Sequence, residues 1–512
     1  MLTKVYGAAV FGIEATTIIV EVNIDKGIGY HLVGLPDNAI RESSYRISAA
    51  LNNIGYKLPG KKITINMAPA DLRKEGSAYD LTLAIGILAA SNQIKSTSIN
   101  EYLIMGELSL DGSLQPIKGV LPIAINAKNE GFKGVILPKQ NANEAAIVEG
   151  LVVYGVENIK EVISFFDAKL PLTPHTISET DDANINAENL EFDFADVKGQ
   201  ESIKRCMEIA AAGGHNIILI GPPGSGKTML AKRLPGILPP MSLSEALETT
   251  KIHSVVGRIK ENYGLMRERP FRSPHHTISD VALVGGGQYP QPGEISMSHN
   301  GVLFLDELPE FKRSVLEVMR QPLEDREVTI SRAKFTITYP SSFMLVASMN
   351  PSPSGFFNDS DSPMTSSPHE MQRYLGKISG PLLDRIDIHI EVTPVPFEKL
   401  SEERTGEKSS VIKQRVIKAR EIQTIRFNAT SKTHYNAQMS VKQIQKHCVL
   451  DTTSKLMLKT AMEKLNLSAR AYDRILKVSR TIADLENSKT IEPHHISEAI
   501  QYRSLDREGW LG

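Results

Sequence analysis

A glycine-rich loop with the sequence GPPGSGKT fills Gly221–Thr228, directly after the apolar run Ile217–Ile220. Glycines at this spacing let a chain turn tightly and direct backbone N–H groups inward, where they bind phosphates at a helix N-terminus. Lys227 would neutralise the β- and γ-phosphates, and the Thr228 hydroxyl would ligate Mg²⁺. Because a strand-like run precedes the loop and a helix-forming run follows it, the pattern predicts a nucleoside triphosphate site, with ATP and Mg²⁺ as the expected ligands.

Two further apolar runs end in polar side chains that suit hydrolysis. The first is followed by Asp306, which would hold Mg²⁺ through water, and by Glu307, which would polarise the attacking water. The second, Phe343–Ser348, is followed by Asn350, which would orient that water or sense the γ-phosphate. Alone, an Asp-Glu pair indicates a strand end in solvent and an Asn-Pro pair indicates a turn. The order of the three elements favours the hydrolytic interpretation.

The elements that must position these groups alternate between strand and helix over residues 193–396. Four apolar runs are predicted to be strands, at 217–220, 302–305, 343–348 and 386–392. Such alternation predicts an α/β core, in which helices flank a parallel sheet. Residues 397–512 carry few β signals and are predicted to form a C-terminal helical lid.

A different pattern precedes this core. Residues 1–166 mix β-like runs, such as 17–22 and 62–67, with helical runs, such as 39–54 and 81–90, which is typical of an α+β domain. Residues 167–192 are polar and acidic and are predicted to be a linker.

The composition narrows the class of protein. With 58 basic and 59 acidic residues the net charge is -1, so a nucleic acid would have to be held by local patches. Two cysteines are too few for a disulfide framework, which suits a reducing compartment. The N-terminal run lacks the order of a secretory signal, and no stretch approaches the roughly 18 apolar residues of a membrane span. We therefore expect a cytoplasmic protein with no membrane partner.

Several long stretches resemble the AAA+ ATPases and, within them, the magnesium-chelatase-like ComM/YifB family. They are FADVKGQ at 194–200, RPFRSPHHTI at 269–278, GVLFLDELPE at 301–310, KISGPLLDRID at 377–387, LSARAYDRIL at 467–476 and RTIAD at 480–484. The likeness extends over almost the whole chain. It implies an AAA+ P-loop core that is completed by the helical lid.

The resemblance implies roles that spacing does not assign. Arg385 matches the arginine finger, which stabilises charge on the γ-phosphate held by a neighbouring subunit, although an ion pair with Asp384 or Asp387 would also explain it. Arg470, in the lid, matches the sensor arginine that couples the nucleotide state to the lid angle. Residues 197–200 would line the adenine pocket. The residues assigned to the nucleotide are Val197, Gln200, Gly221, Pro222, Pro223, Gly224, Ser225, Gly226, Lys227, Thr228 and Met229.

A predicted hairpin at residues 327–338 offers a surface for a polymer. Its tip carries Arg332 and Lys334, and in AAA+ proteins of this branch the hairpin points into a central pore, where both side chains would hold DNA phosphates. Two basic segments, 251–275 and 411–432, are more typical of solvated helix faces. Aromatic residues are sparse, so sequence-specific base readout is not expected.

Metal binding is not expected at two suggestive places. Adjacent histidines such as His275 and His276 rarely chelate one ion, and a structural or pore-loop role is favoured. Many relatives carry Cys-x-Cys pairs shortly after the position of Asn350, where this chain has serines and a methionine. These residues are Ser352, Ser354, Met364 and Ser366. Without thiolates we expect no metal there.

Residues 1–166 resemble a Lon-protease-type domain with a ribosomal S5-like α+β fold. The likeness rests on APADLRKEGSAYD at 68–80 and on GELSLDGSLQPI at 106–117. The corresponding peptidase chemistry needs a serine nucleophile and a lysine base. The place of the serine falls on Ala78 and that of the lysine on Leu121, while Ser77 and Lys118 are near misses. We therefore expect a non-catalytic binding or ring-organising domain.

Three functions are compatible with these features. The leading hypothesis is a ring-forming ATPase, a hexamer, that moves along single-stranded or branched DNA; the likeness to the ComM/YifB family implies helicase or branch-migration activity in recombination or natural transformation. The alternative is chelatase-like, ATP-dependent remodelling of a protein complex without nucleic acid. The third is an ATP-dependent protease. The basic hairpin favours the first over the second, and the missing Ser/Lys pair argues against the third.

Overall fold

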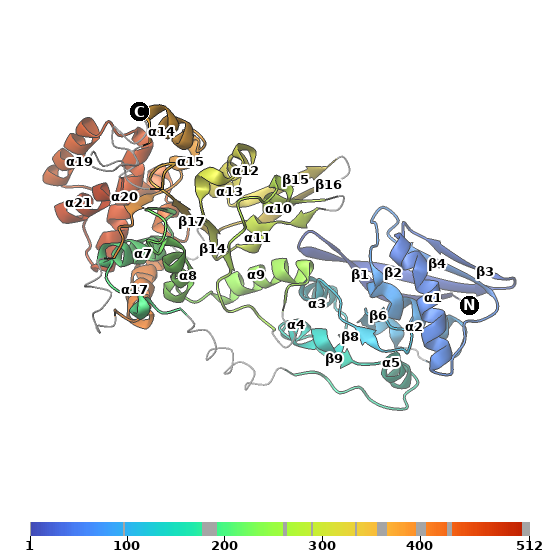
Figure 1. Ribbon diagram of the computed structural model, residues 1–512. Coiled ribbons are helices and arrows are strands. Elements are labelled where there is room, and N and C mark those ends of the chain that lie inside the picture. The colour runs from blue at the N-terminus through green and yellow to red at the C-terminus, as the bar shows by residue number, and fades with distance from the viewer. Residues whose placement is uncertain are drawn as a thin grey trace. The chain divides into compact units, whose positions relative to one another are not determined.

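The computed structural model describes residues 2–503 except 96–97, 177–191, 260–263, 288–289, 333–334, 356–365, 396–405 and 428–432. The chain divides into two compact units, one formed by residues 1–186 and 243–266 and the other by 187–242 and 267–512 (Figure 1). The segment 243–266 lies between the phosphate loop and Asp306 in sequence and was predicted to belong to the ATPase core. In the structure it packs with the N-terminal unit.

The first unit is built on a seven-stranded mixed sheet, in agreement with the predicted α+β pattern. In order across the sheet the strands are β3 (Gly29–Val33), β4 (Lys62–Ala68), β2 (Glu14–Asp25), β1 (Leu2–Phe11), β5 (Tyr102–Ile104), β8 (Gly134–Pro138) and β9 (Val152–Val156). Pairing is antiparallel between β1 and β2 and between β2 and β4, and parallel elsewhere. Sequence reasoning did not single out β1.

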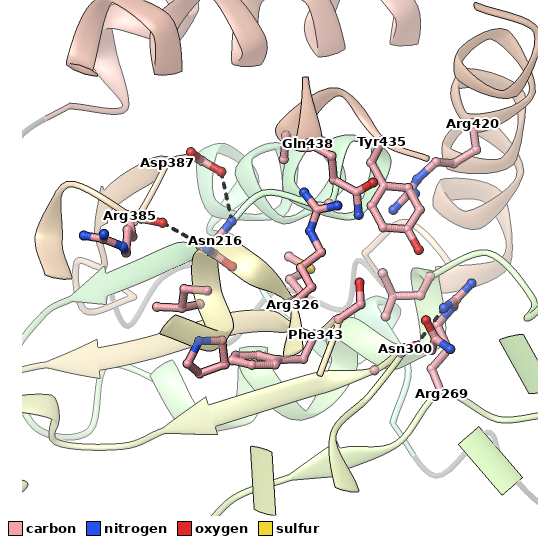
Figure 2. A pocket seen from close by; sticks show the side chains of 18 of the residues that line it. Asn216, Arg269, Asn300, Arg326, Phe343, Arg385, Asp387, Arg420, Tyr435 and Gln438 are labelled. Atoms are coloured by element: carbon pink, nitrogen blue, oxygen red, sulfur yellow. Dashed lines mark hydrogen bonds between the residues drawn. The ribbon is translucent and has the colours of Figure 1, made fainter. Parts of the chain in front are cut away.

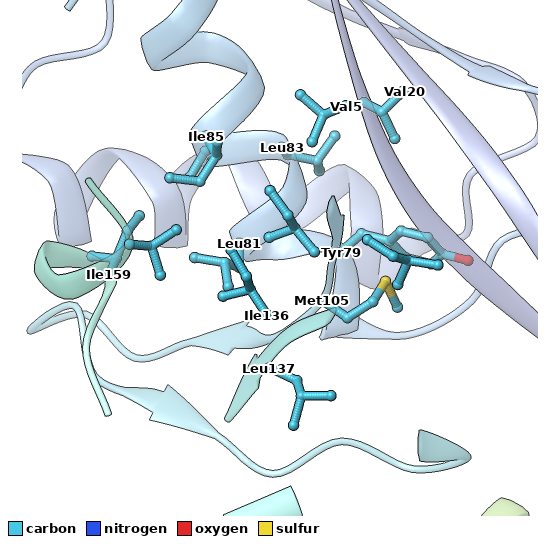
Figure 3. Close-up of a cluster of buried hydrophobic side chains, with 14 of the residues drawn as sticks. Val5, Val20, Tyr79, Leu81, Leu83, Ile85, Met105, Ile136, Leu137 and Ile159 are labelled. Carbon is cyan, nitrogen blue, oxygen red and sulfur yellow. The ribbon is translucent and has the colours of Figure 1, made fainter. Parts of the chain in front are cut away.

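A wholly buried helix lies at the centre of this unit. Every residue of α2 (Asp80–Ala90) is buried, because the helix is apolar on all sides. Figure 3 shows Leu81, Leu83 and Ile85 of α2 among side chains from the strands, including Val5 and Val20. The other helices of the unit are α1 (Asn38–Asn53), α3 (Val120–Asn129), α4 (Ala142–Ala145), α5 (Ile159–Phe166) and α9 (Leu243–Val256).

A buried carboxylate joins α9 to this unit. Glu144 accepts hydrogen bonds from the backbone N–H of Leu121, at 2.9 Å, and from the hydroxyl of Ser254 on α9. The backbone N–H of Gly119 donates to the carbonyl of Ser254 at 3.0 Å. Burial raises the pKa of Glu144, and these hydrogen bonds offset part of that effect.

We expect Glu144→Gln to raise the melting temperature of this unit at neutral pH. The amide keeps an acceptor for both donors and removes a buried charge. Because the folded-state pKa of this acid is raised, the wild-type protein loses stability as the pH rises through that pKa, so the gain should be larger at pH 8 than at pH 5. Calorimetry should show a shift of about 2–4 °C per kcal/mol gained. The exposed Glu149→Gln is the matched control, and a gain that is independent of pH would contradict the charge argument.

The second unit contains a five-stranded parallel sheet, as the alternating pattern predicted. In order its strands are β11 (Phe271–Arg272), β14 (Val302–Leu305), β17 (Met344–Met349), β10 (Ile217–Ile220) and β18 (Ile388–Glu391). The four strands from β14 to β18 match the predicted runs. Because all neighbours are parallel, the carboxyl ends of β10, β14 and β17 lie at one edge of the sheet and their amino ends at the other.

Helices cover this sheet and continue into a helical C-terminal region. They include α7 (Glu201–Gly213), α8 (Lys227–Ile237), α12 (Arg313–Val318), α13 (Arg320–Asp325), α17 (Ser409–Phe427), α18 (Val441–His447), α19 (Thr452–Lys464), α20 (Ala469–Leu485) and α21 (Pro493–Gln501). Figure 1 shows α19, α20 and α21 grouped together in red, and α17 and α20 pack against α7. Among the residues described, no helix has the length and apolar character that crossing a bilayer requires.

Candidate nucleotide-binding site

The phosphate loop connects the carboxyl end of β10 to the start of α8, as predicted. Gly224 and Gly226 have φ of 76° and 91°, in the left-handed region that favours glycine. The ammonium of Lys227 donates to the carbonyl of Gly221 at 2.6 Å and to Oδ1 of Asn350 at 3.3 Å. Burial lowers the pKa of Lys227. The structure thus brings Lys227 and Asn350 together, and the β- and γ-phosphates are the group that such a lysine binds.

A Mg²⁺ ion would fit the oxygen atoms beside this loop. The hydroxyl of Thr228 donates to Oδ2 of Asp306 at 2.8 Å, so the two predicted metal ligands are in direct contact. Ser348, at the end of β17, donates to the other oxygen of Asp306 and accepts from the backbone N–H of Glu307 at 3.2 Å. Hydroxyl and carboxylate oxygens are the ligands that Mg²⁺ prefers. Sequence reasoning missed Ser348, although its position one strand away from Asp306 was a usable signal.

The predicted general base lies at the open side of the site. The side chain of Glu307 is 54 % exposed, and its Oε2 lies 3.7 Å from Nδ1 of His276. The ring of His276 lies 4.1 Å from that of His275. The structural or pore-loop role predicted for His276 stays a prediction, and the structure places this side chain beside the predicted base. The motif at 269–278 contained this signal, but nothing in the sequence related it to Glu307.

The residues predicted to surround the base of the nucleotide differ in their surroundings. The amide of Gln200 donates to the carbonyl of Ser225, within the phosphate loop, at 3.0 Å and to that of Thr393 at 3.3 Å. Val197 is 1 % exposed and belongs to the hydrophobic core, whereas Met229 is exposed on α8. Gln200 is therefore adjacent to the loop, and the adenine contacts of Val197 and Met229 stay predictions.

Arg385 and Arg470 lie close to each other. They are at the end of the sheet opposite the phosphate loop. Arg385 precedes β18 and forms an ion pair with Glu324, and Arg470 binds Asp384 at 2.7 Å. Both therefore lie at the amino edge of the sheet, whereas Lys227 lies at the carboxyl edge. A strand of four residues separates the edges by roughly 13 Å. Arg470 lies on α20, in the helical C-terminal region as predicted, and its role as a sensor and that of Arg385 as a finger stay predictions.

The predicted hairpin is present. Strands β15 (Glu327–Arg332) and β16 (Phe335–Pro340) pair antiparallel, with Arg332 opposite Phe335. Arg332 is exposed, and Lys334 lies outside the described residues. A second hairpin, β12 (Gly285–Gly286) with β13 (Gln291–Pro292), packs alongside, since the hydroxyl of Tyr339 on β16 donates to the carbonyl of Pro290 at 2.7 Å.

The structure describes only some of the positions after Asn350 at which this chain has no cysteine. The hydroxyls of Ser352 and Ser354 lie 2.8 Å apart, Ser366 begins the described residues that follow, and Met364 lies outside them. The absence of a metal here stays a prediction.

Comparison with known proteins agrees with these features. Three family models match successive parts of the chain. They are "Subunit ChlI of Mg-chelatase" over residues 20–141, "Magnesium chelatase, subunit ChlI" over 193–400, and "Magnesium chelatase, subunit ChlI C-terminal" over 406–503. Competence protein ComM of Haemophilus influenzae is 45% identical over 510 residues, which cover 99% of this chain and 98% of that protein. The chain belongs to the magnesium-chelatase-like ComM/YifB family.

Two further relatives are similar to the chain, one over nearly its whole length and one over about a third of it. The YifB protein of Escherichia coli is 44% identical over 510 residues, covering 99% of this chain and 98% of YifB. Lon protease 2 of Bacillus subtilis is 27% identical over 206 residues, 36% of each chain. Membership of the ComM/YifB family makes the protein a magnesium-chelatase-like AAA+ ATPase, with use of a nucleotide and Mg²⁺ implied.

Proposed function

We propose that this protein is a ring-forming ATPase, a hexamer, that couples ATP hydrolysis to movement along DNA. The position of Arg385 and Arg470 carries the proposal. Both lie at the edge of the sheet opposite the phosphate loop, so neither reaches a nucleotide bound to its own chain. A head-to-tail ring would bring this edge against the phosphate loop of the neighbouring subunit. Two arginines would then stabilise charge on the neighbour's γ-phosphate.

The hairpin β15–β16 supports DNA as the substrate. Its exposed Arg332 stands next to the turn, and the second hairpin supports it from the side. A backbone contact of this kind binds single-stranded or branched DNA without reading its sequence. One relative is named a competence protein. We infer helicase or branch-migration activity in recombination or natural transformation.

The N-terminal unit supports a role other than peptide cleavage. Ala78 and Leu121 occupy the two places where a Lon-type peptidase needs serine and lysine, and the backbone of Leu121 binds Glu144. The hydroxyl of Ser77 donates to Glu107. Among the described residues no hydrogen bond joins Ser77 to Lys118. We propose a Lon-like, non-catalytic domain that organises the ring.

ATP hydrolysis should rise when single-stranded or forked DNA is added, and Arg332→Gln should weaken this response. Each phosphate contact that is lost lowers the slope of log affinity against log salt by about one unit. The measurement is phosphate release over a salt series with and without DNA. Arg373→Gln, an exposed arginine of α14 (Pro368–Leu375), is the matched control.

A hydrolysis rate and an oligomeric state that are both indifferent to DNA would contradict DNA movement. They would favour the alternative, chelatase-like remodelling of a protein complex, which the family match to magnesium chelatase subunits also supports.

A further inference from the structure

A second polar cavity lies at the edge of the sheet opposite the phosphate loop. It is a small hollow of about 80 Å³ in the second unit. Asn216, Gly301 and Phe343, which line it, immediately precede β10, β14 and β17. The hollow is therefore at the amino ends of these parallel strands (Figure 2), whereas Lys227 follows the carboxyl end of β10.

The lining of this hollow is strongly cationic. Five arginines line it against one carboxylate, that of Asp387. They are Arg269, Arg326, Arg385, Arg420 and Arg474. They come from separate elements, including the carboxyl end of α13, helix α17 and helix α20. Placing several like charges in one partly buried space is costly unless anionic groups compensate them.

Four of the five arginines are bound by groups of the protein. Arg474 lies 2.8 Å from Asp387; burial raises the pKa of Asp387, but the charge of Arg474 together with His215 and Lys477 lowers it on balance. Arg385 is paired with Glu324. The remaining two use carbonyl acceptors: Arg269 donates to Pro239 and Asn300 at 2.7 Å each, and Arg420 donates to Ala211 at 3.0 Å. Asp387 and Glu324 thus each offset one arginine of this cluster.

Arg326 is the exception. Among the described residues its guanidinium has no hydrogen bond and no ion pair with the protein, and burial lowers its pKa. In Figure 2 it projects into the middle of the hollow, near Tyr435 and Gln438 of the segment that contains η6 (Asn436–Gln438). Its backbone φ is 59°, at the position after α13 where glycine or asparagine is usual. An arginine thus occupies a strained position, and among the residues described no acceptor binds its five donors.

We propose that this hollow binds a phosphate group, with Arg326 as the side chain that anchors it. The planar guanidinium matches two phosphate oxygens at once, and the neighbouring arginines supply the field that favours an anion over water. The ligand is free orthophosphate or the phosphate of a nucleotide. Because Arg326 follows α13, Tyr435 adjoins η6 and Arg474 belongs to α20, the anion would connect the sheet core to the helical C-terminal region. The site does not depend on the proposed DNA activity.

Orthophosphate binding should be measured in a Lys227→Ala background, in which the phosphate loop no longer competes. Titration calorimetry and the melting temperature are recorded as phosphate replaces chloride at constant ionic strength. Phosphate should bind and raise the melting temperature of Lys227→Ala, while adding Arg326→Gln should weaken binding at least tenfold. Arg320→Gln is the matched control and should change nothing, since Arg320 at the start of α13 is partly exposed and pairs with Glu317 of α12.

A second variant, Arg326→Gly, tests whether a lost phosphate response could be due to misfolding. Arg326→Gly removes the guanidinium and suits the positive φ, so its melting temperature in chloride should not fall, yet it should also lose the phosphate response. Binding of ADP that depends on Arg326, without binding of orthophosphate, would identify a nucleotide as the source of the phosphate. Phosphate or ADP binding that is equal in the Arg326 variants and the control, or absent from Lys227→Ala, would overturn the proposal.

Discussion

Glu307→Gln should leave ATP binding intact and reduce ATP hydrolysis about 100- to 10,000-fold, the range typical of losing a general base. The amide has nearly the same shape as the carboxylate but cannot polarise the attacking water. The contacts of the phosphate loop do not involve the Glu307 side chain, because Lys227 is held by the carbonyl of Gly221 and Thr228 by Asp306. Equilibrium binding of a fluorescent ATP analogue and the rate of phosphate release measure the two effects separately.

Two comparisons sharpen this prediction. Glu310→Gln removes another acidic group three residues later, one that pairs with Lys377 at 3.1 Å, and should leave the rate within about twofold. Lys227→Ala should abolish binding as well as turnover, since it removes the only charge that the loop directs at the phosphates. A Glu307→Gln protein that hydrolyses ATP at close to the wild-type rate would contradict the assignment of the base.

Several helices and strands of both units could be predicted because their apolar residues recur at the repeat of a helix or of a strand. The strand β4 and the helix α2 match the predicted runs to within a residue, and so do β10 and β14 of the core. The segment 243–266 could not be placed in this way. Its helix is anchored by Glu144, a residue about 100 positions away, through a contact that no periodicity encodes.

The residues of the candidate site likewise divide into those that could be predicted from the sequence and those that could not. Lys227, Asp306 and Asn350 could be predicted because each follows an apolar strand, Lys227 after the phosphate loop, and parallel strands bring their carboxyl ends to one edge. The contact of His276 with Glu307, and the pairing of Arg470 with Asp384, depend on how loops and a separate helical region pack. Position along the chain carries no such information, so the sequence placed Arg470 in the helical lid but gave no sign that it pairs with Asp384, next to Arg385.

Arg385→Ala should lower ATP hydrolysis about 1,000-fold or more while ATP still binds, because an arginine finger acts on the transition state. The phosphate loop of the mutated chain is intact, and Glu324, the partner of Arg385, is 59 % exposed and so is not left as a buried charge. Arg320→Ala, a surface arginine with a similar ion pair, should leave the rate unchanged. Unchanged turnover in Arg385→Ala would refute the finger.

Mixing variants decides whether the site is shared between subunits. Arg385→Ala chains keep the phosphate loop and Lys227→Ala chains keep the arginine, so each is inactive alone. In a head-to-tail ring made from equal amounts of both, roughly a quarter of the interfaces join an intact loop to an intact arginine, and hydrolysis should recover in proportion. If Arg385 served its own chain, no mixed interface would be complete and the mixture would stay as inactive as either parent. Recovery therefore requires that Arg385 reach across to another subunit, which is what its place at the amino edge of the sheet leads us to expect.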